Sequence, residues 1–584
     1  MDLTTTEANQ VNKPTWQTSG EGIFSKPNRV RCEKYVLSIQ RRLDRAVANG
    51  DKPRIRWYSH ILLKRSRAAK ILSVYRICVI NQGKRTAGVD GVAMPKDRSK
   101  AIPKMMELLE SADIERKPSR IRRVDIPKPN GDKRPLGIPT IEDRINQDII
   151  RQTIEPICEY YFSHQSYGFR PKRSCHDAIE DIFAKMSRKA SRQWVVEGDI
   201  KGCFNHIKHS HITETLKEWG IGETMTTIID KMLKSGVMKD GVTTEVSEGT
   251  PQGGVISPLL ANVALTCLDN EMVKHDFHNK ESNPIVRYAD DFVIVAKSKE
   301  QAEAIKGFVA TFLEKNVGVE LSEEKTKITH INNGFDFLGF NLKKYKNKML
   351  IIPSKENISR VKRNLKGKLR ECRDSRAVVE RLNPIIIGWS NYYRHCNAKY
   401  IFNQIANAYL WRRIWEWAGK KHPTRTRKYR VAKYYDNWTF TDKPSGKQIR
   451  RMNDTAIRRF VKVKKGKRVY DAKVRDYWEH RDKVKAIGSI FTESKLVKTL
   501  FMEQKGKCLY CKEPVTQADV QSSNTHIHHM TPRSEGGDWK LSNLRLLHAD
   551  CHTELHGNIS RQDMAKFMGN KIDYLRLMKF NRPE

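Results

Sequence analysis

Three aspartates have the types and spacing of a metal-dependent catalytic site. Asp290 and Asp291 are adjacent in IVRYADDFVIVAK (285–297), between two β-branched runs that predict a hairpin. Adjacent carboxylates at a tight turn repel each other unless a cation neutralises them, and a pair of Mg²⁺ ions would do so. Asp199 follows the apolar run Trp194–Val196 and supplies a third carboxylate. Taken alone, an Asp-Asp pair is more often a solvated turn, so the surrounding motifs decide between that alternative and a two-metal centre for phosphoryl transfer.

Motifs around these aspartates resemble those of reverse transcriptases. The order of DIKGCF (199–204), TPQGG (250–254), YADD (288–291) and LSEEKTKI (321–328) is similar to theirs. Two further stretches, IPKPNGDKRPLGIP (126–139) and SYGFRPKRS (166–174), resemble the group II intron-encoded proteins. The resemblance covers about residue 60 to about residue 560. It implies a right-hand polymerase in which Asp199, Asp290 and Asp291 hold two Mg²⁺ ions.

The resemblance also implies roles for residues that contact the incoming dNTP. Lys128 and Arg134 flank a fingers hairpin over the triphosphate, where the alternative is a solvated basic turn. Phe204 is similar to the gate that excludes a ribose 2′-hydroxyl, where the alternative is an ordinary core residue. Gln252 lies in a Pro/Gly turn that can meet the nucleotide. Lys325 is a candidate proton donor to pyrophosphate, with the nearby Lys327 as the alternative.

A Cys/His-rich unit near the end of the chain has the spacing of a zinc site. Cys508-x-x-Cys511 places two thiolates on one turn, within reach of a tetrahedral ion. His548-x-x-Cys551 supplies the second half. The sequence therefore predicts a closed structural Zn²⁺ site of the Cys₃His type, with unliganded buried thiols as the alternative.

The histidines between and after these halves resemble an HNH nuclease. The resemblance assigns His528, His552 and His556 to a catalytic divalent ion, His529 to the general base and Asn543 to the loop that orients that base. Two departures affect this assignment: His548 stands where many HNH units carry cysteine, and His526 stands where an acid is common. A zinc deaminase is excluded, because His-x-Glu before Pro-Cys-x-x-Cys is missing.

Elsewhere the pattern changes from mixed α/β to helical. Residues ~31–80 are expected to be helical, and from ~355 apolar residues recur at helical spacing between Lys and Arg. Within this second region, NPIIIGWSNYYRH (383–395) resembles the maturase domain of the same family. The i, i+4 spacing of Trp411 and Trp415 predicts that both lie in a helix core, with Arg412 and Arg413 pointing outwards. The alternative is that the aromatic residues of these basic helices stack on RNA bases.

Charge and composition indicate a nucleic-acid partner. Lys and Arg number 109 against 67 Asp and Glu, a formal charge of +42 spread along the chain. Apolar runs are shorter than the ~20 residues that cross a bilayer, so no membrane span is expected. The start of the chain does not resemble a secretory signal, and eight of the 11 cysteines are scattered. We expect a cytoplasmic protein, bacterial or organellar, that is nucleoid-associated when on DNA.

These observations predict a multidomain α/β right-hand polymerase, an α-helical thumb and maturase domain, a basic DNA-binding segment and a small ββα-metal HNH domain. The expected boundaries are a flexible arm at 1–30, fingers and palm with a helical extension at 31–353, thumb and maturase domain at 354–430, basic segment at 431–498 and HNH domain at 499–584.

The resemblance implies a multifunctional protein that copies RNA into DNA, assists intron splicing and nicks target DNA to prime reverse transcription during intron mobility. Its partners would be group II intron RNA, target DNA and dNTPs. The alternatives are a retron-type or diversity-generating reverse transcriptase, against which the zinc and HNH tail argues. A splicing-only maturase is a third, although YADD and DIKGCF are intact. A DNA-binding zinc module would not need His528 and His529.

Overall fold

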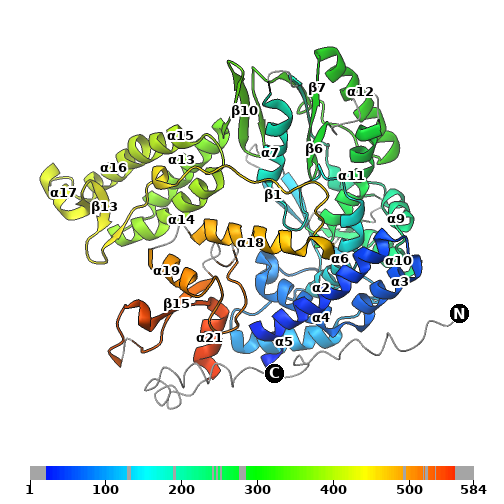
Figure 1. Ribbon diagram of the computed structural model, residues 1–584, viewed down its shortest axis with the longest axis horizontal. Helices are drawn as coiled ribbons and strands as arrows, with labels where there is room; N and C mark the ends of the chain where they lie inside the picture. Colours follow the sequence, from blue (N-terminus) through cyan, green and yellow to red (C-terminus); the bar gives the residue numbers. More distant parts are fainter. Residues whose placement is uncertain are drawn as a thin grey trace. The chain divides into compact units, whose positions relative to one another are not determined.

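The computed structural model divides the chain into two compact units (Figure 1). The first unit comprises residues 1–162, 204–263 and 467–584, and the second comprises 163–203 and 264–466. Within the ranges that the structure describes, every helix is too short or too polar to cross a bilayer. These ranges are 21–127, 133–188, 192–239, 242–244, 248–249, 253–274, 284–490, 495–516, 519, 524–532 and 535–558.

The first unit begins with packed helices, as the pattern of residues ~31–80 predicts. The longest starts after Ser25, whose hydroxyl accepts a hydrogen bond from the backbone N–H of Asn28, and Pro27 occupies its first turn, where no helical N–H is needed. The elements are η1 (Glu21–Phe24), α2 (Lys26–Ala48), α3 (Lys52–His60), η2 (Ile61–Arg65), α4 (Arg67–Tyr75), η3 (Arg76–Ile80), η4 (Gln82–Arg85), α5 (Arg98–Ser111) and α6 (Ile141–Tyr161).

A small mixed sheet completes the polymerase part of this unit. Its strand order is β2-β1-β4-β5, with β1 antiparallel to β2 and parallel to β4. The tip of the β1–β2 hairpin, 128–132, lies outside the described residues. The elements are β1 (Ile121–Pro127), β2 (Lys133–Ile138), α9 (His209–Glu218), α10 (Glu223–Leu233), β4 (Val237–Lys239) and β5 (Val242–Thr244).

The C-terminal part of the first unit contacts its N-terminal helices through ion pairs. Arg29 of α2 donates to Asp550 at 2.9 Å, and its guanidinium lies 3.6 Å from the ring centroid of Tyr75. Arg468 donates to both carboxylate oxygens of Asp44 at 3.1 Å. The elements here are η7 (Ala472–Val474), α18 (Arg475–Ile490), α19 (Lys495–Glu503), β15 (Thr525–His529), η9 (Leu541–Asn543), β16 (Leu544–His548) and α21 (Ala549–Asn558).

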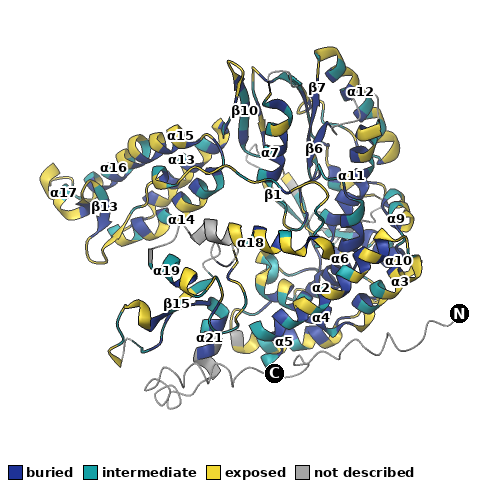
Figure 2. Cartoon of the chain, viewed as in Figure 1, coloured by how far each residue is buried: buried dark blue, intermediate teal, exposed yellow. Residues whose placement is uncertain are grey.

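The second unit is built on an antiparallel sheet with strand order β6-β7-β3-β8. Its strands β6 and β7 are mostly buried because helices α7 and α12 and a second sheet cover them, whereas the edge strand β8 is more polar and less buried (Figure 2). The elements are α7 (Cys175–Met186), β3 (Trp194–Gly198), β6 (Ile285–Tyr288), β7 (Asp291–Ala296), α12 (Lys299–Asn316), β8 (Lys327–His330), β9 (Phe335–Phe337), β10 (Phe340–Tyr345) and β11 (Lys348–Pro353). Two helices, α8 (Cys203–His206) and α11 (Ser257–Lys274), cross the divisions between the units.

The rest of the second unit is the helical region expected from ~355. Val361, Leu365 and Leu369 are buried along α13, as their helical spacing predicts. The elements are α13 (Lys355–Arg370), α14 (Ser375–Tyr393), α15 (Lys399–Asn403), η5 (Gln404–Leu410), α16 (Trp411–Lys421), α17 (Arg427–Tyr434), β12 (Tyr435–Asp436), β13 (Thr439–Asp442), β14 (Lys447–Gln448) and η6 (Met452–Asp454). The basic segment 431–498 contributes to both units.

The prediction for the paired tryptophans of α16 is half wrong. Trp415 is partly buried and packs against the core of the second unit, but Trp411 keeps 39% of its surface exposed. Trp411 opens α16, directly after the π-helical turn η5, so its ring lies on Trp415 at the edge of the core.

Candidate active sites

Strand register brings two of the three predicted aspartates together. In the antiparallel β3–β7 pair, Gly198 lies opposite Phe292. The next residue on each strand is therefore Asp199 on one side and Asp291 on the other. A Cβ on Gly198 would lie 2.1 Å from Cζ of Phe292, so only glycine leaves room for that ring. The strand register thus puts both carboxylates at the same end of the sheet, and the Phe292 ring packs on Gly198 next to them.

Asp290 is held in the two-residue turn that joins β6 to β7, as the sequence predicts. Tyr288 pairs with Asp291, and Ala289 adopts φ 62°, a left-handed value suited to a tight hairpin. The backbone of Gly168 runs against this turn: a Cβ there would lie 2.3 Å from the nitrogen of Ala289. Glycine in SYGFRPKRS therefore allows the close contact that fixes the turn.

A buried ion pair between β6 and α11 anchors the same turn. The side chains of Arg287 in β6 and Asp269 in α11 are both fully buried. Arg287 Nη2 lies 2.6 Å from Asp269 Oδ2, its Nε donates to Oδ1 at 2.9 Å, and its Nη1 donates to the carbonyl of Ala289 at 2.9 Å. One guanidinium therefore joins the helix, the strand and the catalytic turn.

The electrostatics of the site reflect crowded carboxylates. Desolvation and the neighbouring charges of Asp290 and Asp199 raise the pKa of Asp291 to about 6. Lys325 donates to Asp199 at 2.9 Å, and this hydrogen bond raises the pKa of the lysine. Three acids and one cation leave a net negative centre, which suits divalent cations with oxygen ligands.

The predicted nucleotide-binding residues are placed less completely. Phe204 is half-buried in α8, in the first unit, whereas the aspartates belong to the second. Arg134 lies in β2, but its side chain is outside the described residues, as are Lys128 and Gln252. Their contacts with a nucleotide stay predictions.

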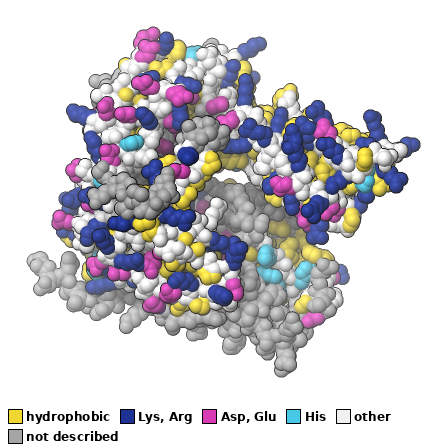
Figure 3. All heavy atoms as spheres, turned by 180° about the vertical axis from the view of Figure 1, so that it is seen from behind, with side chains coloured by type: hydrophobic (Ala, Val, Ile, Leu, Met, Phe, Trp, Pro, Cys, Tyr) yellow, Lys and Arg dark blue, Asp and Glu magenta, His cyan; other side chains and the backbone are white. Residues whose placement is uncertain are grey.

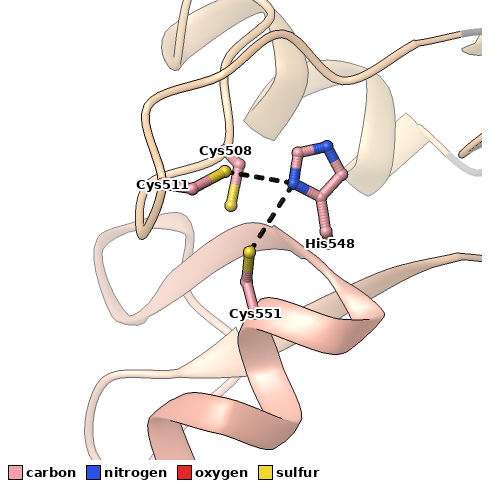
Figure 4. A group of neighbouring side chains, drawn as sticks. All are labelled: Cys508, Cys511, His548 and Cys551. Atoms are coloured by element: carbon pink, nitrogen blue, oxygen red, sulfur yellow. Dashed lines mark hydrogen bonds between the residues drawn. The ribbon is translucent and has the colours of Figure 1, made fainter. Parts of the chain in front are cut away.

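The Cys/His cluster forms as the spacing predicts (Figure 4). Among the described residues, the one such cluster whose ligand atoms all lie within 4.8 Å of one another comprises Cys508, Cys511, His548 and Cys551. Nδ1 of His548 lies 3.4 Å from Sγ of Cys511 and 3.8 Å from Sγ of Cys551. Ligands bonded at ~2.0–2.3 Å to a tetrahedral ion would be separated by similar distances, so these residues fit zinc.

Asp519 supports the cluster, although it was not predicted from the sequence. Its carboxylate lies 3.5 Å from Nε2 of His548 and accepts hydrogen bonds from Thr516. Burial disfavours the charged ring, but Asp519 and the cysteine sulfurs outweigh it and raise the pKa of His548 to about 11. A carboxylate behind the ring orients Nδ1 towards the sulfurs, as is usual for metal-ligating histidines.

The HNH histidines divide between two faces of the β15–β16 hairpin. His528 is buried and its ring centroid lies 5.3 Å from that of His552 in α21, while His526 contacts the same His552 ring. His529 alternates to the other face, where its ring centroid lies 4.5 Å from that of Trp539. Its buried Nε2 has no hydrogen-bond partner within the part of the chain that the structure describes. The backbone of His556 is in α21, but its side chain is outside the described residues.

Asn543 holds the loop after β15. Its Oδ1 accepts from the backbone N–H of Thr531 at 2.7 Å, and its Nδ2 donates to the carbonyls of Thr531 and Asp538. This bracing fits the orienting role expected for it. The histidines, Asn543 and the cluster lie in one ββα unit, with His526 and His528 on one face of the hairpin and His529 on the other.

Gly168, Asp269, Arg287 and Asp519 position these sites without being predicted from the sequence. A charged residue among the apolar residues of β6 was a signal for Arg287, since a buried guanidinium needs a partner. Its partner could not be identified, because Asp269 is one of many acids in helical patterns.

Comparison with known proteins agrees with this geometry. Four family models match in order: the N-terminal domain of reverse transcriptase (28–106), reverse transcriptase or RNA-dependent DNA polymerase (126–342), the group II intron maturase-specific domain (358–435) and HNH endonuclease (508–558). The predicted fold class and domain types are confirmed.

Two relatives extend the match beyond single domains. Protein YkfC of Escherichia coli K12 is 35% identical in an alignment 298 residues long, and the match covers 46% of this chain and 78% of YkfC. The group II intron-encoded protein LtrA of Lactococcus lactis is 30% identical in an alignment 370 residues long. That match covers 53% of this chain and 60% of LtrA, which is less than two thirds of LtrA. The chain belongs to the group II intron-encoded proteins, with reverse transcriptase, maturase and HNH endonuclease domains in one polypeptide.

Proposed function

We propose that the chain copies intron RNA into DNA at the aspartate site, assists the splicing of that RNA and nicks target DNA with its HNH domain to make the primer. The single observation that carries the polymerase assignment is the β3–β7 register, which aligns Asp199 with Asp291 beside the turn of Asp290. The partners are group II intron RNA, target DNA and dNTPs, in a bacterial or organellar compartment where the protein lies on the nucleoid.

Asp199, Asp290 and Asp291 would hold two Mg²⁺ ions. When bound, such ions activate a primer 3′-hydroxyl and neutralise the triphosphate. Lys325, whose Nζ is 2.9 Å from Asp199, keeps its proton and is placed to donate it towards departing pyrophosphate. Lys128 and Arg134 contact the triphosphate, Gln252 contacts the nucleotide, and Phe204 excludes the 2′-hydroxyl of a ribonucleotide.

In the HNH unit, His528, His552 and His556 would hold one divalent ion, which polarises the scissile phosphate when bound. His529 accepts the proton of the attacking water at Nε2, a buried atom that none of the described residues engages in a hydrogen bond. Asn543 fixes the loop beside it. Cys508, Cys511, His548 and Cys551 would hold a zinc ion, which would stabilise the fold of the unit without taking part in the chemistry.

Primer extension on an RNA template tests the palm assignment. Asp290→Ala should lower the rate at least about a thousandfold, since loss of one metal ligand removes several kcal/mol of transition-state stabilisation. RNA binding should be unchanged. Asp454→Ala, an exposed aspartate in η6, is the matched control and should extend at the wild-type rate. Near wild-type extension by Asp290→Ala would contradict the assignment.

A further inference from the structure

The second unit contains a recess that has no role in the sites described above. It lies between the η5–α16 segment and the β12–β14 sheet and holds about 290 Å³. We call this recess the aromatic pocket. Its lining includes Trp411, Tyr435, Trp438, Arg450 and Arg451. The volume is near the lower end of the ~300–1,000 Å³ usual for small-ligand pockets, so it suits one planar group.

Trp438 has a conformation that packing alone does not explain. It occupies the second position of the two-residue turn between β12 and β13, with φ 60° after Asn437 at φ 45°. Glycine or asparagine normally takes a left-handed position, and a bulky residue there is strained. The tryptophan is nevertheless 69% exposed, so its ring gains little burial in the folded protein. Backbone strain that presents an exposed aromatic ring is typical of a binding site.

Trp411 presents a second aromatic face to the same pocket. One face of its ring stacks on Trp415, with centroids 5.6 Å apart and planes 5° from parallel. The stack orients Trp411 while 39% of its surface stays exposed. A flat ligand could therefore extend an aromatic stack that the fold has already begun.

The polar groups of the pocket favour an anionic ligand that carries hydrogen-bond acceptors. Tyr435 is 95% buried, with 5% of its surface exposed, and its enclosed hydroxyl has no hydrogen-bond partner among the described residues. Burial raises its pKa, so the phenol stays neutral and the charge at the pocket comes from arginines. Arg450 and Arg451 are exposed at the rim, where Arg451 also donates to Thr439 at 2.6 Å. Figure 3 shows Lys and Arg side chains gathered over the α13–α17 region, at the right of that view.

We propose that the aromatic pocket takes one unpaired base of RNA, stacked against Trp438 and Trp411, with the adjoining phosphates held by Arg450 and Arg451. An unpaired base is required, because a base within a duplex has both faces covered by its neighbours. RNA is the expected nucleic acid because residues 358–435, which include Trp411 and Tyr435, match the maturase-specific domain. The proposal rests on the proposed RNA-binding function and assigns a place on the protein for one of its contacts.

Trp438→Ala in the full-length chain tests the pocket directly. The probes are an RNA hairpin with one bulged 2-aminopurine, the same hairpin fully paired, and the DNA version of the bulged hairpin. Loss of one stacking face should weaken binding of the bulged RNA roughly 5- to 150-fold, with about twofold change or less for the paired RNA. Wild-type protein should quench the 2-aminopurine fluorescence, and Trp438→Ala should not.

Tyr400→Ala is the matched control. Tyr400 is an aromatic residue of the same unit, 71% exposed in α15, and it is not part of the pocket. This variant should bind all three probes as wild type does. Arg450→Gln and Arg451→Gln should each reduce the slope of log affinity against log salt by roughly 0.7–0.9.

Three results would overturn the proposal: equal weakening of bulged and paired RNA by Trp438→Ala, no weakening of either, or equal losses for bulged RNA and bulged DNA. Trp438→Gly guards against misfolding, because glycine relieves the left-handed strain while still removing the ring. If wild-type protein bound none of the RNAs, the proposed function itself would fail. If it bound them and the tryptophan variants behaved as wild type, only the pocket would fail.

Discussion

The palm and the HNH unit place catalytic side chains by different means. In the palm, Asp199 and Asp291 are fixed by the register of a buried four-stranded sheet, and the turn of Asp290 is held by Gly168 and Arg287. In the HNH unit, the histidines lie on a two-stranded hairpin and one helix over a small apolar core. A two-stranded hairpin is marginally stable alone, so this unit depends on its Cys/His cluster.

The difference predicts that zinc removal separates the two sites. Cys508→Ala, or treatment with a chelator, should unfold residues 495–558, because a structural zinc contributes about 10–16 kcal/mol in zinc-finger peptides. Metal analysis should show reduced zinc, and limited proteolysis should cut this region, while primer extension on RNA persists. Cys267→Ala, a half-buried cysteine in α11, is the control and should keep its zinc. Full zinc content and protease resistance in Cys508→Ala would contradict the assignment of the cluster as a structural zinc site.

His529→Ala should behave differently from Cys508→Ala. It should lose nicking but keep zinc and protease resistance, because a general base is not a zinc ligand. Activity alone cannot distinguish the two variants, so zinc content and proteolysis must be measured beside it. Unfolding of His529→Ala would mean that its packing on Trp539 is structural.

The buried Arg287–Asp269 ion pair that anchors the palm turn can be broken by a single substitution. Arg287→Met leaves Asp269 as a buried charge without its partner and should lower the free energy of unfolding of the second unit by about 3–5 kcal/mol. Arg376→Met breaks an exposed pair with Glu380 and should change it by less than about 1 kcal/mol. Denaturant melts compare the two variants. Equal effects would show that burial does not set the strength of the palm pair.

Gly168→Ala tests whether close backbone contact positions the aspartates. The added Cβ would lie 2.3 Å from Ala289 N, so the turn must move, and a shift of ~1 Å at a catalytic group lowers kcat about a hundredfold. Gly307→Ala in α12 adds its Cβ in open space and should leave primer extension unchanged. A raised KM with an unchanged kcat in Gly168→Ala would place this glycine in substrate binding instead.

The smallest expected effect is a dependence of stability on pH in the second unit. Burial lowers the pKa of His395 to about 4, helped by the nearby charges of Arg394 and Arg458. Between pH 6.5 and 4 the unfolded chain binds more protons at this ring than the folded chain, so stability is lost as pH falls through that window. His395→Gln should recover about 2 kcal/mol near pH 4, after allowance for the partly exposed ring. Identical pH profiles of wild type and His395→Gln, measured by thermal melts, would contradict this.

The sequence predicted the candidate site residues more completely than the residues that position them. The turn at Asp290 and the Cys/His cluster were predicted because local spacing determines both. Asp269 and Asp519 act through contacts with residues distant in the sequence, so no local pattern indicates them. Trp411 was misplaced because i, i+4 spacing identifies a shared helix face but not where the core beneath that face ends.

The ion pair between Arg29 and Asp550 has a consequence for the order of synthesis. The two residues are separated by 521 positions. At the ~5–20 residues per second of translation, α2 emerges from the ribosome about 25–100 s before its partner. The other contacts of Arg29, with the ring of Tyr75 and the backbone carbonyl of Phe24, involve residues that are made long before Asp550. The ion pair therefore joins helices that are synthesised early to a segment that is synthesised much later.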